Sequence, residues 1–112
     1  MNGNKGTRFS ADEQAVAVVA KALGHPARVA IVRLLATRAT CTTGELVAEL
    51  PLSQSTVSQH LKELKAAGLV ESVPGSAREG YALSPSRWAQ VRQLFGTLLG
   101  ELPPAGATLP LV

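Results

Sequence analysis

Apolar residues recur along this chain mainly at helical spacing. In Ser10–Gly24 they fall on one side of a helix, and in His25–Arg38 they follow the i, i+3, i+4, i+7 pattern of a helix that faces a core. A shorter segment, Thr42–Leu50, and a longer one, Ser53–Ala67, repeat this pattern with only two residues between them. Two helices joined so closely must turn sharply, which is the layout of a helix-turn-helix.

Residues typical of helix ends bracket these four segments. Ser10 and Thr42 each precede a glutamate by three residues, which is the spacing of a capping box. Pro26 fits a first helical position, where its missing N–H costs nothing. Ser53 is a good N-cap and Gly68 a good C-terminal stop. The end residues therefore predict the same helices as the apolar spacing.

Beyond Gly68 the pattern changes to that of strands. Leu69–Val73 and Tyr81–Leu83 flank a loop rich in Pro, Gly and Ser, which predicts a β-hairpin with a projecting tip. Ser84–Gly100 returns to helical spacing with a broad apolar face. The expected fold is mainly α with a small β-hairpin, a winged helix-turn-helix in the order α-α-α-α-β-β-α. We expect a flexible segment over residues 1–8, a folded domain over 9–100 and a tail over 101–112.

Composition limits the class of protein. The 112 residues suffice for one domain with one modest core, and 46% hydrophobic with 17% charged residues is typical of a globular chain. The single cysteine, Cys41, cannot form an internal disulfide. The N-terminal residues lack the apolar core of a signal peptide, and no apolar run approaches the length of a membrane span. We therefore expect a cytoplasmic protein without membrane attachment.

Charge and motifs narrow the function. A net charge of +3 and a pI near 9.5 permit a polyanionic partner without requiring one. The sequence has no paired-carboxylate arrangement, no glycine-rich phosphate loop, and no Cys or Ser beside a plausible base. An enzyme is therefore not expected.

The outer face of the Ser53–Ala67 helix carries the main functional signal. Val57, Leu61 and Leu64 form its buried stripe. Short polar residues occupy the opposite side and both flanks, although Ser and Thr are mediocre helix formers. Such side chains read base edges in the major groove, whereas the alternative is a solvated face. The predicted DNA-contact residues of this helix are Gln54, Ser55, Thr56, Ser58, Gln59, His60, Lys62 and Lys65.

Four residues, His60 and three outside this helix, have two interpretations or a local role. Ser76 and Arg78 in the hairpin loop could reach flanking phosphates or the minor groove, although Arg78 beside Glu79 could equally be a solvated loop charge. His60 could donate to a phosphate or pack at the edge of the core. His25 precedes Pro26, so we expect it to serve the start of that helix.

Four stretches together carry a family resemblance: ALGHPARVAIVRLLA, TTGELVAEL, LSQSTVSQHLKELKAAGLV and GYAL. On these stretches the chain resembles the ArsR/SmtB family of bacterial winged-helix repressors over about Phe9–Gly100. The resemblance implies a homodimer built mainly from the first and last helices, on a palindromic operator, with repression by occlusion of a promoter. Apolar positions on these two helices independently suit a dimer surface, the alternative being intramolecular core. The predicted interface residues are Val16, Val19, Leu23, Trp88, Val91, Leu94, Phe95 and Leu98.

Many members of the family sense metals or arsenite. The positions that match one family site are Thr42, Gly44 and Glu45, with Cys41 just before them, and soft metals need several thiolates. The other family site uses Asp, His and Glu on the last helix, and Ser86–Gly100 contains none of these. We therefore predict no metal at these two sites and no cofactor, although a dimer could pair Cys41 with His25 across chains. Redox sensing generally needs paired cysteines, and Cys41 is the single cysteine of this chain.

The expected partners are double-stranded DNA, a second copy of the chain, and an unknown small-molecule or protein inducer. A protein-interaction module whose main partner is another protein is the competing hypothesis. It is motivated by the small net charge of +1 over Ser53–Arg87.

Overall fold

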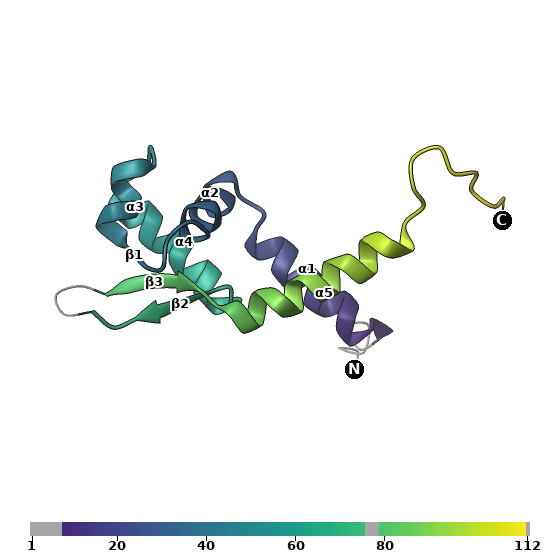
Figure 1. Ribbon diagram of the computed structural model, residues 1–112, viewed down its shortest axis with the longest axis horizontal. Coiled ribbons are helices and arrows are strands. Elements are labelled where there is room, and N and C mark those ends of the chain that lie inside the picture. Colours follow the sequence, from purple (N-terminus) through teal and green to yellow (C-terminus); the bar gives the residue numbers. More distant parts are fainter. Residues whose placement is uncertain (1–7, 76–78, 112) are drawn as a thin grey trace.

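The computed structural model describes residues 8–75 and 79–111, so the predicted contacts Ser76 and Arg78 lie outside the described residues. The predicted order of four helices, a hairpin and a last helix is confirmed, and the fold is a winged helix-turn-helix (Figure 1). The elements in chain order are α1 (Ala11–Ala22), α2 (Pro26–Leu35), β1 (Cys41–Thr42), α3 (Thr43–Glu49), α4 (Gln54–Ala66), β2 (Val70–Val73), β3 (Gly80–Leu83) and α5 (Pro85–Glu101).

The sheet has a strand that the sequence did not predict. β1 pairs antiparallel with β3, with Cys41 opposite Tyr81, so the strand order is β1-β3-β2 rather than a simple hairpin. β2 pairs with β3 in the register that sets Val70 opposite Leu83. A strand of two residues is too short to show an alternating pattern, so only its pairing partner reveals it.

Most of the predicted helix ends are confirmed. Ser10 and Thr42 each form a complete capping box, and Ser53 caps α4 by accepting a bond from the Thr56 amide. Gly68, directly after the α4 cap, has a φ of +76°, which favours glycine over any residue with a Cβ. Ser84 is the N-cap of α5, but its side chain makes no capping hydrogen bond.

The core lies where α2, α3 and α4 meet the sheet. Its largest fully buried side chains include Ile31, Leu46, Leu64 and Leu69, and Cys41 of β1 is buried with them. Because aromatic residues make up only 4% of the chain, aliphatic side chains supply almost all of this packing. The core fixes the orientation of α4 and leaves its other side outward.

α1 and α5 lie against each other on the side away from α3 (Figure 1). The start of α5 is tied to the turn after α4: the Trp88 indole Nε1 donates to the Leu69 carbonyl at 2.9 Å, and Arg87 Nε donates to the Ala67 carbonyl at 3.2 Å. Among the described residues, no single helix has the length and apolar character needed to cross a membrane. The bent pair α1 and α2 meets that test only when taken together, with 94° between them.

Candidate nucleic-acid interface

α4 presents a polar side that the core leaves uncovered. Val57, Leu61 and Leu64 are at most 2% exposed, so they hold the helix against the core. The opposite side carries the residues expected there from the helical spacing. Gln54, Ser55, Ser58, Gln59, Lys62 and Lys65 are all exposed, and Thr56 is half-buried.

The N-terminal end of α4 is a cluster of hydroxyl groups. The Ser53 hydroxyl donates to Thr56 Oγ1 at 2.9 Å and accepts from the Thr56 amide at 3.3 Å. Its oxygen also lies 3.2 Å from Ser55 Oγ. These bonds hold the hydroxyls in place at the end of the helix whose dipole is positive. One turn further, Gln59 Nε2 donates to Glu63 Oε2 at 3.3 Å, which orients the Gln59 amide along the helix.

Lys65 is directed toward the hairpin. Its Nζ donates to the Ser72 hydroxyl on β2 at 2.7 Å, and the Tyr81 hydroxyl on β3 donates to Glu79 Oε1 at 3.2 Å. Hydrogen bonds from Ser72 and then Tyr81, with the charge of Lys65 nearby, lower the pKa of the Glu79 carboxyl, so Glu79 is ionised at neutral pH. Lys65 thus joins α4 to β2 of the hairpin.

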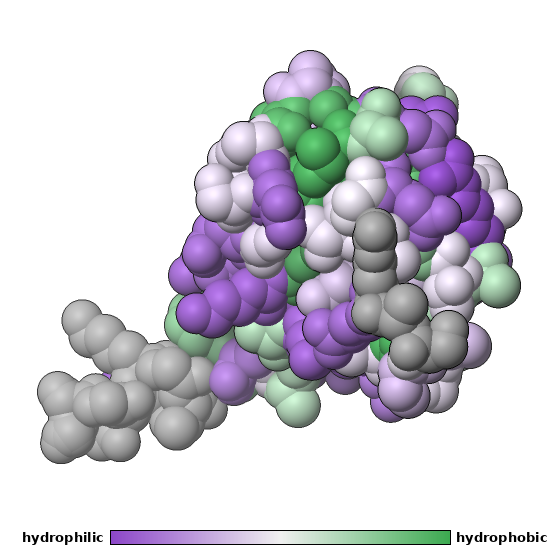
Figure 2. All heavy atoms as spheres, turned by 90° about the vertical axis from the view of Figure 1, so that its left-hand side faces the viewer, coloured by the Kyte–Doolittle hydropathy of each residue, from purple (hydrophilic) through white to green (hydrophobic). Residues whose placement is uncertain are grey.

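Ser72, Glu79 and Tyr81 were missed by the sequence reasoning as part of this polar group. The available signal was the two-residue spacing of Glu79, directly before β3, and Tyr81 within it, which sets both side chains on one side of an extended segment. Figure 2 looks at the end of the molecule from which the hairpin projects. It shows a surface that is mostly hydrophilic or neutral, with one compact hydrophobic area.

His60 is placed inside the domain. It is 8% exposed, and its Nδ1 accepts a hydrogen bond from Arg28 Nε of α2 at 3.1 Å. Of the two roles considered for His60, the structure supports packing at the core and contradicts a direct phosphate contact, because the imidazole is covered by α2. The prediction for His25 is confirmed: it is the N-cap of α2, and its Nδ1 accepts from the Ala27 amide at 3.0 Å.

The predicted dimer residues divide into two groups. Val19 and Val91 are 0% and 6% exposed within one chain, so they pack in its own core. Leu98 is exposed, and the other five predicted residues, Val16, Leu23, Trp88, Leu94 and Phe95, are half-buried. The sequence reasoning left out of its predicted interface several exposed apolar side chains on or beside the same helices: Phe9, Val18, Leu99 and Leu102.

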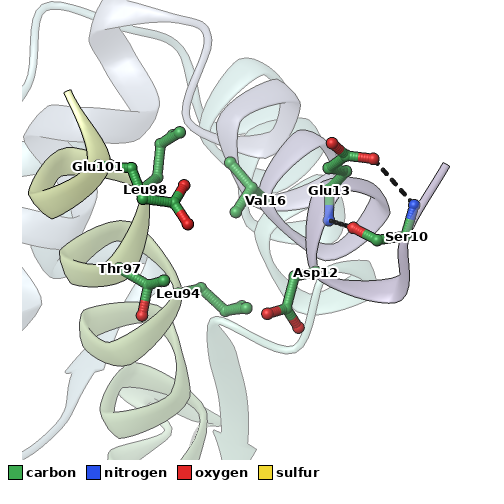
Figure 3. Close-up of a pocket in the computed structure, with 8 residues that line it drawn as sticks. All are labelled: Ser10, Asp12, Glu13, Val16, Leu94, Thr97, Leu98 and Glu101. Carbon is green, nitrogen blue, oxygen red and sulfur yellow. Dashed lines mark hydrogen bonds between the residues drawn. The ribbon is translucent and has the colours of Figure 1, made fainter.

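A cleft of about 310 Å³ separates parts of α1 and α5. Figure 3 shows Val16 of α1 facing Leu94 and Leu98 of α5 across it, with the carboxylates of Asp12 and Glu101 at its margin. The cleft therefore has an apolar floor and an acidic rim.

The Cys41 thiol is free and buried in the core of the domain. Burial raises the pKa of the Cys41 thiol, and Arg38 Nη1 lies 3.7 Å from its sulfur while also pairing with Glu49. Thr42 and Glu45, two of the positions that match a family metal site, bond to each other in the capping box of α3. In residues 8–75 and 79–111, no three His, Cys, Asp or Glu side chains gather as a potential metal site.

Comparison with known proteins points to one family of regulators. The model of the arsR family of bacterial regulatory proteins matches residues 25–72, from the cap of α2 into β2. The chain is 44% identical over 72 residues to the HTH-type transcriptional regulator Rv2034 of Mycobacterium tuberculosis, a match that covers 64% of this chain and 66% of that protein. The chain thus spans just under two thirds of that relative.

Two further proteins extend the likeness beyond the helix-turn-helix. The HTH-type transcriptional regulator CmtR of Mycobacterium bovis is 37% identical over 90 residues, which cover 80% of this chain and 70% of that protein. An ArsR-like transcriptional regulator from Rhodococcus sp. RHA1, of known structure, superposes with a TM-score of 0.69 at 28% identity, over 79% of this chain and 80% of that one.

Proposed function

This chain belongs to the ArsR family of bacterial transcriptional regulators, and from that premise we propose that it binds a palindromic DNA operator as a homodimer and represses transcription. The family is one of regulators and not of enzymes. The observation that carries the proposal is the exposed polar side of α4, with Ser55, Ser58 and Gln59 opposite the stripe that packs on the core. α4 is the second helix of the helix-turn-helix, which enters the major groove in such motifs.

The side chains of α4 suit distinct contacts. Gln54, Ser55, Ser58 and Gln59 lie in the half nearest the N-terminus, where glutamine amides and serine hydroxyls can reach base edges. Lys62 lies one turn further along and suits a phosphate or a guanine. Lys65 supports the interface differently, because its bond to Ser72 holds the hairpin beside α4.

A second copy would dock through α1 and α5. Phe9, Val18, Leu98, Leu99 and Leu102, on or beside these two helices, are each at least 38% exposed. Large apolar side chains left open in this way suit an interface with a partner. A two-fold axis through this interface would pair two α4 helices for two half-sites. We also propose that the protein acts in the cytoplasm without metal at the two family sites, and that a small molecule or a protein is its inducer.

The decisive experiment measures binding to the DNA upstream of its own operon against random duplex of equal length, over a series of salt concentrations. Specific binding should weaken steeply with salt, because phosphate contacts release counterions. Equal affinity for both duplexes at moderate salt would contradict the proposal. If a protein were then recovered by co-purification, the interaction-module hypothesis would be favoured instead.

Gln59→Ala and Lys62→Ala should weaken DNA binding in different ways. Gln59→Ala should relax base preference at one position, with a loss on the order of tenfold on the operator and little change on random DNA. Lys62→Ala should weaken both duplexes alike and reduce the slope of log affinity against log salt by about one. Titrations of each variant on both duplexes test this. Identical effects of the two substitutions on both duplexes would show that α4 does not read bases.

Glu79→Gln should strengthen DNA binding. The carboxylate is ionised and exposed directly before β3, at the loop end of the hairpin, where it would repel phosphate. Glutamine keeps an oxygen that accepts the bond from Tyr81. We expect affinity to rise about threefold at low salt and the gain to shrink as salt screens the charge. Glu71→Gln, an exposed carboxylate on β2 without a bond to Tyr81, is the matched comparison. Unchanged affinity of the Glu79→Gln variant would show that Glu79 does not lie near the DNA phosphates.

A further inference from the structure

We propose that Arg28 is a positioning residue for DNA binding, which holds α4 in place through a neutral His60, so that DNA binding is lost when this histidine gains a proton. The inference rests on the proposed function, because it takes α4 to be the helix that reads DNA. Neither residue touches DNA in this proposal. Their effect passes through the packing of three helices.

A single guanidinium joins those three helices. Arg28 belongs to α2; its Nε donates to His60 Nδ1 on α4 at 3.1 Å, and its Nη1 donates to the Ala22 carbonyl at the end of α1 at 3.3 Å. His60 is 8% exposed, so few water molecules can replace this bond. Arg28 therefore links the proposed recognition helix to a helix of the proposed dimer surface. Since α2 and α4 also pack on each other, the bond fixes their relative rotation.

The bond requires a neutral imidazole. Nδ1 of His60 can accept from Arg28 only while it keeps its lone pair, so protonation would set an N–H against the guanidinium N–H. His25 has the same requirement, because its Nδ1 accepts from the Ala27 amide at the start of α2. The two rings lie 4.5 Å apart between centroids, which brings two positive charges together if both gain protons. Protonation of His60 would thus disturb the α2–α4 contact beside the cap of α2.

The surrounding charges favour the neutral form of His60. A cavity of about 480 Å³ on the Arg28 side of this pair is lined by Lys21 of α1, the cap residue His25, Arg28 of α2 and Glu63 of α4, and not by His60 itself. Glu63 is the one carboxylate among its described lining residues, and it already accepts from Gln59. Burial, followed by the charges of His25 and Arg28, lowers the pKa of His60 below the usual value for histidine.

The direction of the pH effect follows from this shift. In the unfolded chain His60 titrates at the ordinary value of about 6.5, so below that pH the unfolded chain takes up protons that the folded domain resists. The free energy of unfolding should therefore be complete above about pH 6.5 and decline as the pH falls below it. The arrangement of α4 should be lost only at the lower pH at which the folded domain itself protonates His60. The chain contains only two histidines, His25 and His60.

The test measures DNA affinity and thermal stability of the full chain between about pH 7.5 and about pH 5, a range that spans the ordinary histidine pKa. The DNA probe is a duplex selected from a random library on the wild-type protein at neutral pH. Affinity of the wild type should fall toward tenfold for each pH unit once His60 titrates. His60→Asn should flatten this profile to within about twofold, because Asn Oδ1 accepts near the place of Nδ1 and does not titrate. His25→Asn keeps an N-cap acceptor, so the pH profile of this variant shows how much of the loss of affinity depends on His25.

Arg28 is tested at neutral pH. Arg28→Ala should weaken binding at least about tenfold, and Arg28→Lys should restore part of it, since lysine can reach one of the two acceptors. The inference would be overturned if Arg28→Ala bound DNA with wild-type affinity, or if the affinity of His60→Asn fell with pH as steeply as that of the wild type. Either result would leave the proposed specific DNA binding intact. If Arg28→Ala does not fold, the profile of His60→Asn decides alone. Absence of selected DNA binding by the wild type would overturn the proposed function and this inference with it.

Discussion

Ser58→Glu should abolish specific DNA binding and leave the domain folded. Ser58 is exposed on the polar side of α4, and glutamate is a better helix former than serine, so the helix loses no stability. The longer, charged side chain would face the phosphates and hold the helix out of the groove. It would also stand one turn before Lys62, at the spacing of a helical ion pair, and divert that cation from DNA. Binding on a palindrome should fall at least about 100-fold, since both half-sites carry a like-charge contact.

Thr108→Glu is the matched control for this charge change. Thr108 is exposed in the C-terminal segment, which Figure 1 shows at the far end of the molecule from α3 and the hairpin. It adds the same charge, so any loss due to net charge alone would appear in both variants. Operator titrations, with circular dichroism to check folding, compare the two. Equal affinities of Ser58→Glu and Thr108→Glu would show that α4 is not the DNA-reading helix.

Leu99→Glu should convert the proposed dimer into a monomer. Leu99 is 62% exposed on α5, so its replacement removes little from the core of one chain. In a two-fold dimer each substitution acts twice, and burying one leucine contributes about 1.5–3 kcal/mol. The dimer dissociation constant should therefore rise at least about 100-fold, and more where the carboxylate loses water. A monomer holds one half-site, so affinity for a palindrome should fall with it.

Leu111→Glu controls for the loss of an exposed leucine. Leu111 is 100% exposed near the end of the chain, away from the surface formed by α1 and α5. Sedimentation velocity over a range of protein concentrations should show a dimer for the wild type and for Leu111→Glu, and a monomer for Leu99→Glu. A Leu99→Glu variant that stays dimeric would place the interface elsewhere on the chain.

These predictions separate two surfaces at opposite parts of the fold. α4 and the hairpin carry the proposed DNA contacts, whereas α1 and α5 carry the proposed dimer contacts. Arg87 and Trp88 connect the two, because their bonds to the Ala67 and Leu69 carbonyls tie the start of α5 to the end of α4. A change in the position of α5 would therefore act on α4 through these two bonds.

Much of the fold could be predicted because its causes lie close together in the sequence. Each capping box involves residues three positions apart, and the stripe of Val57, Leu61 and Leu64 repeats with the helical turn. The exposed side of α4 follows from that stripe without any knowledge of its neighbours. The same reasoning predicted His25 as the cap of α2.

Burial was harder to predict where a helix touches two surfaces. Val19 and Leu98 both fit an apolar face, yet the structure encloses Val19 completely and leaves Leu98 exposed. Spacing alone shows which side of a helix is apolar. It does not show how much of that side a neighbouring element covers, which depends on where α5 crosses α1.

The sequence by itself thus determined the helices, their ends, the hairpin and the polar side of α4. The tertiary structure alone decided the pairing of β1 with β3, the bond from Lys65 to Ser72 and the contact of Arg28 with His60. The physical reason is range. Caps and helical stripes depend on neighbours within one or two turns. The β1–β3 pairing and the Arg28–His60 contact instead join residues that are distant in sequence. Even the closer pair Lys65 and Ser72 meets only because β2 turns back beside α4. Such contacts form only once the chain has folded to bring their partners together.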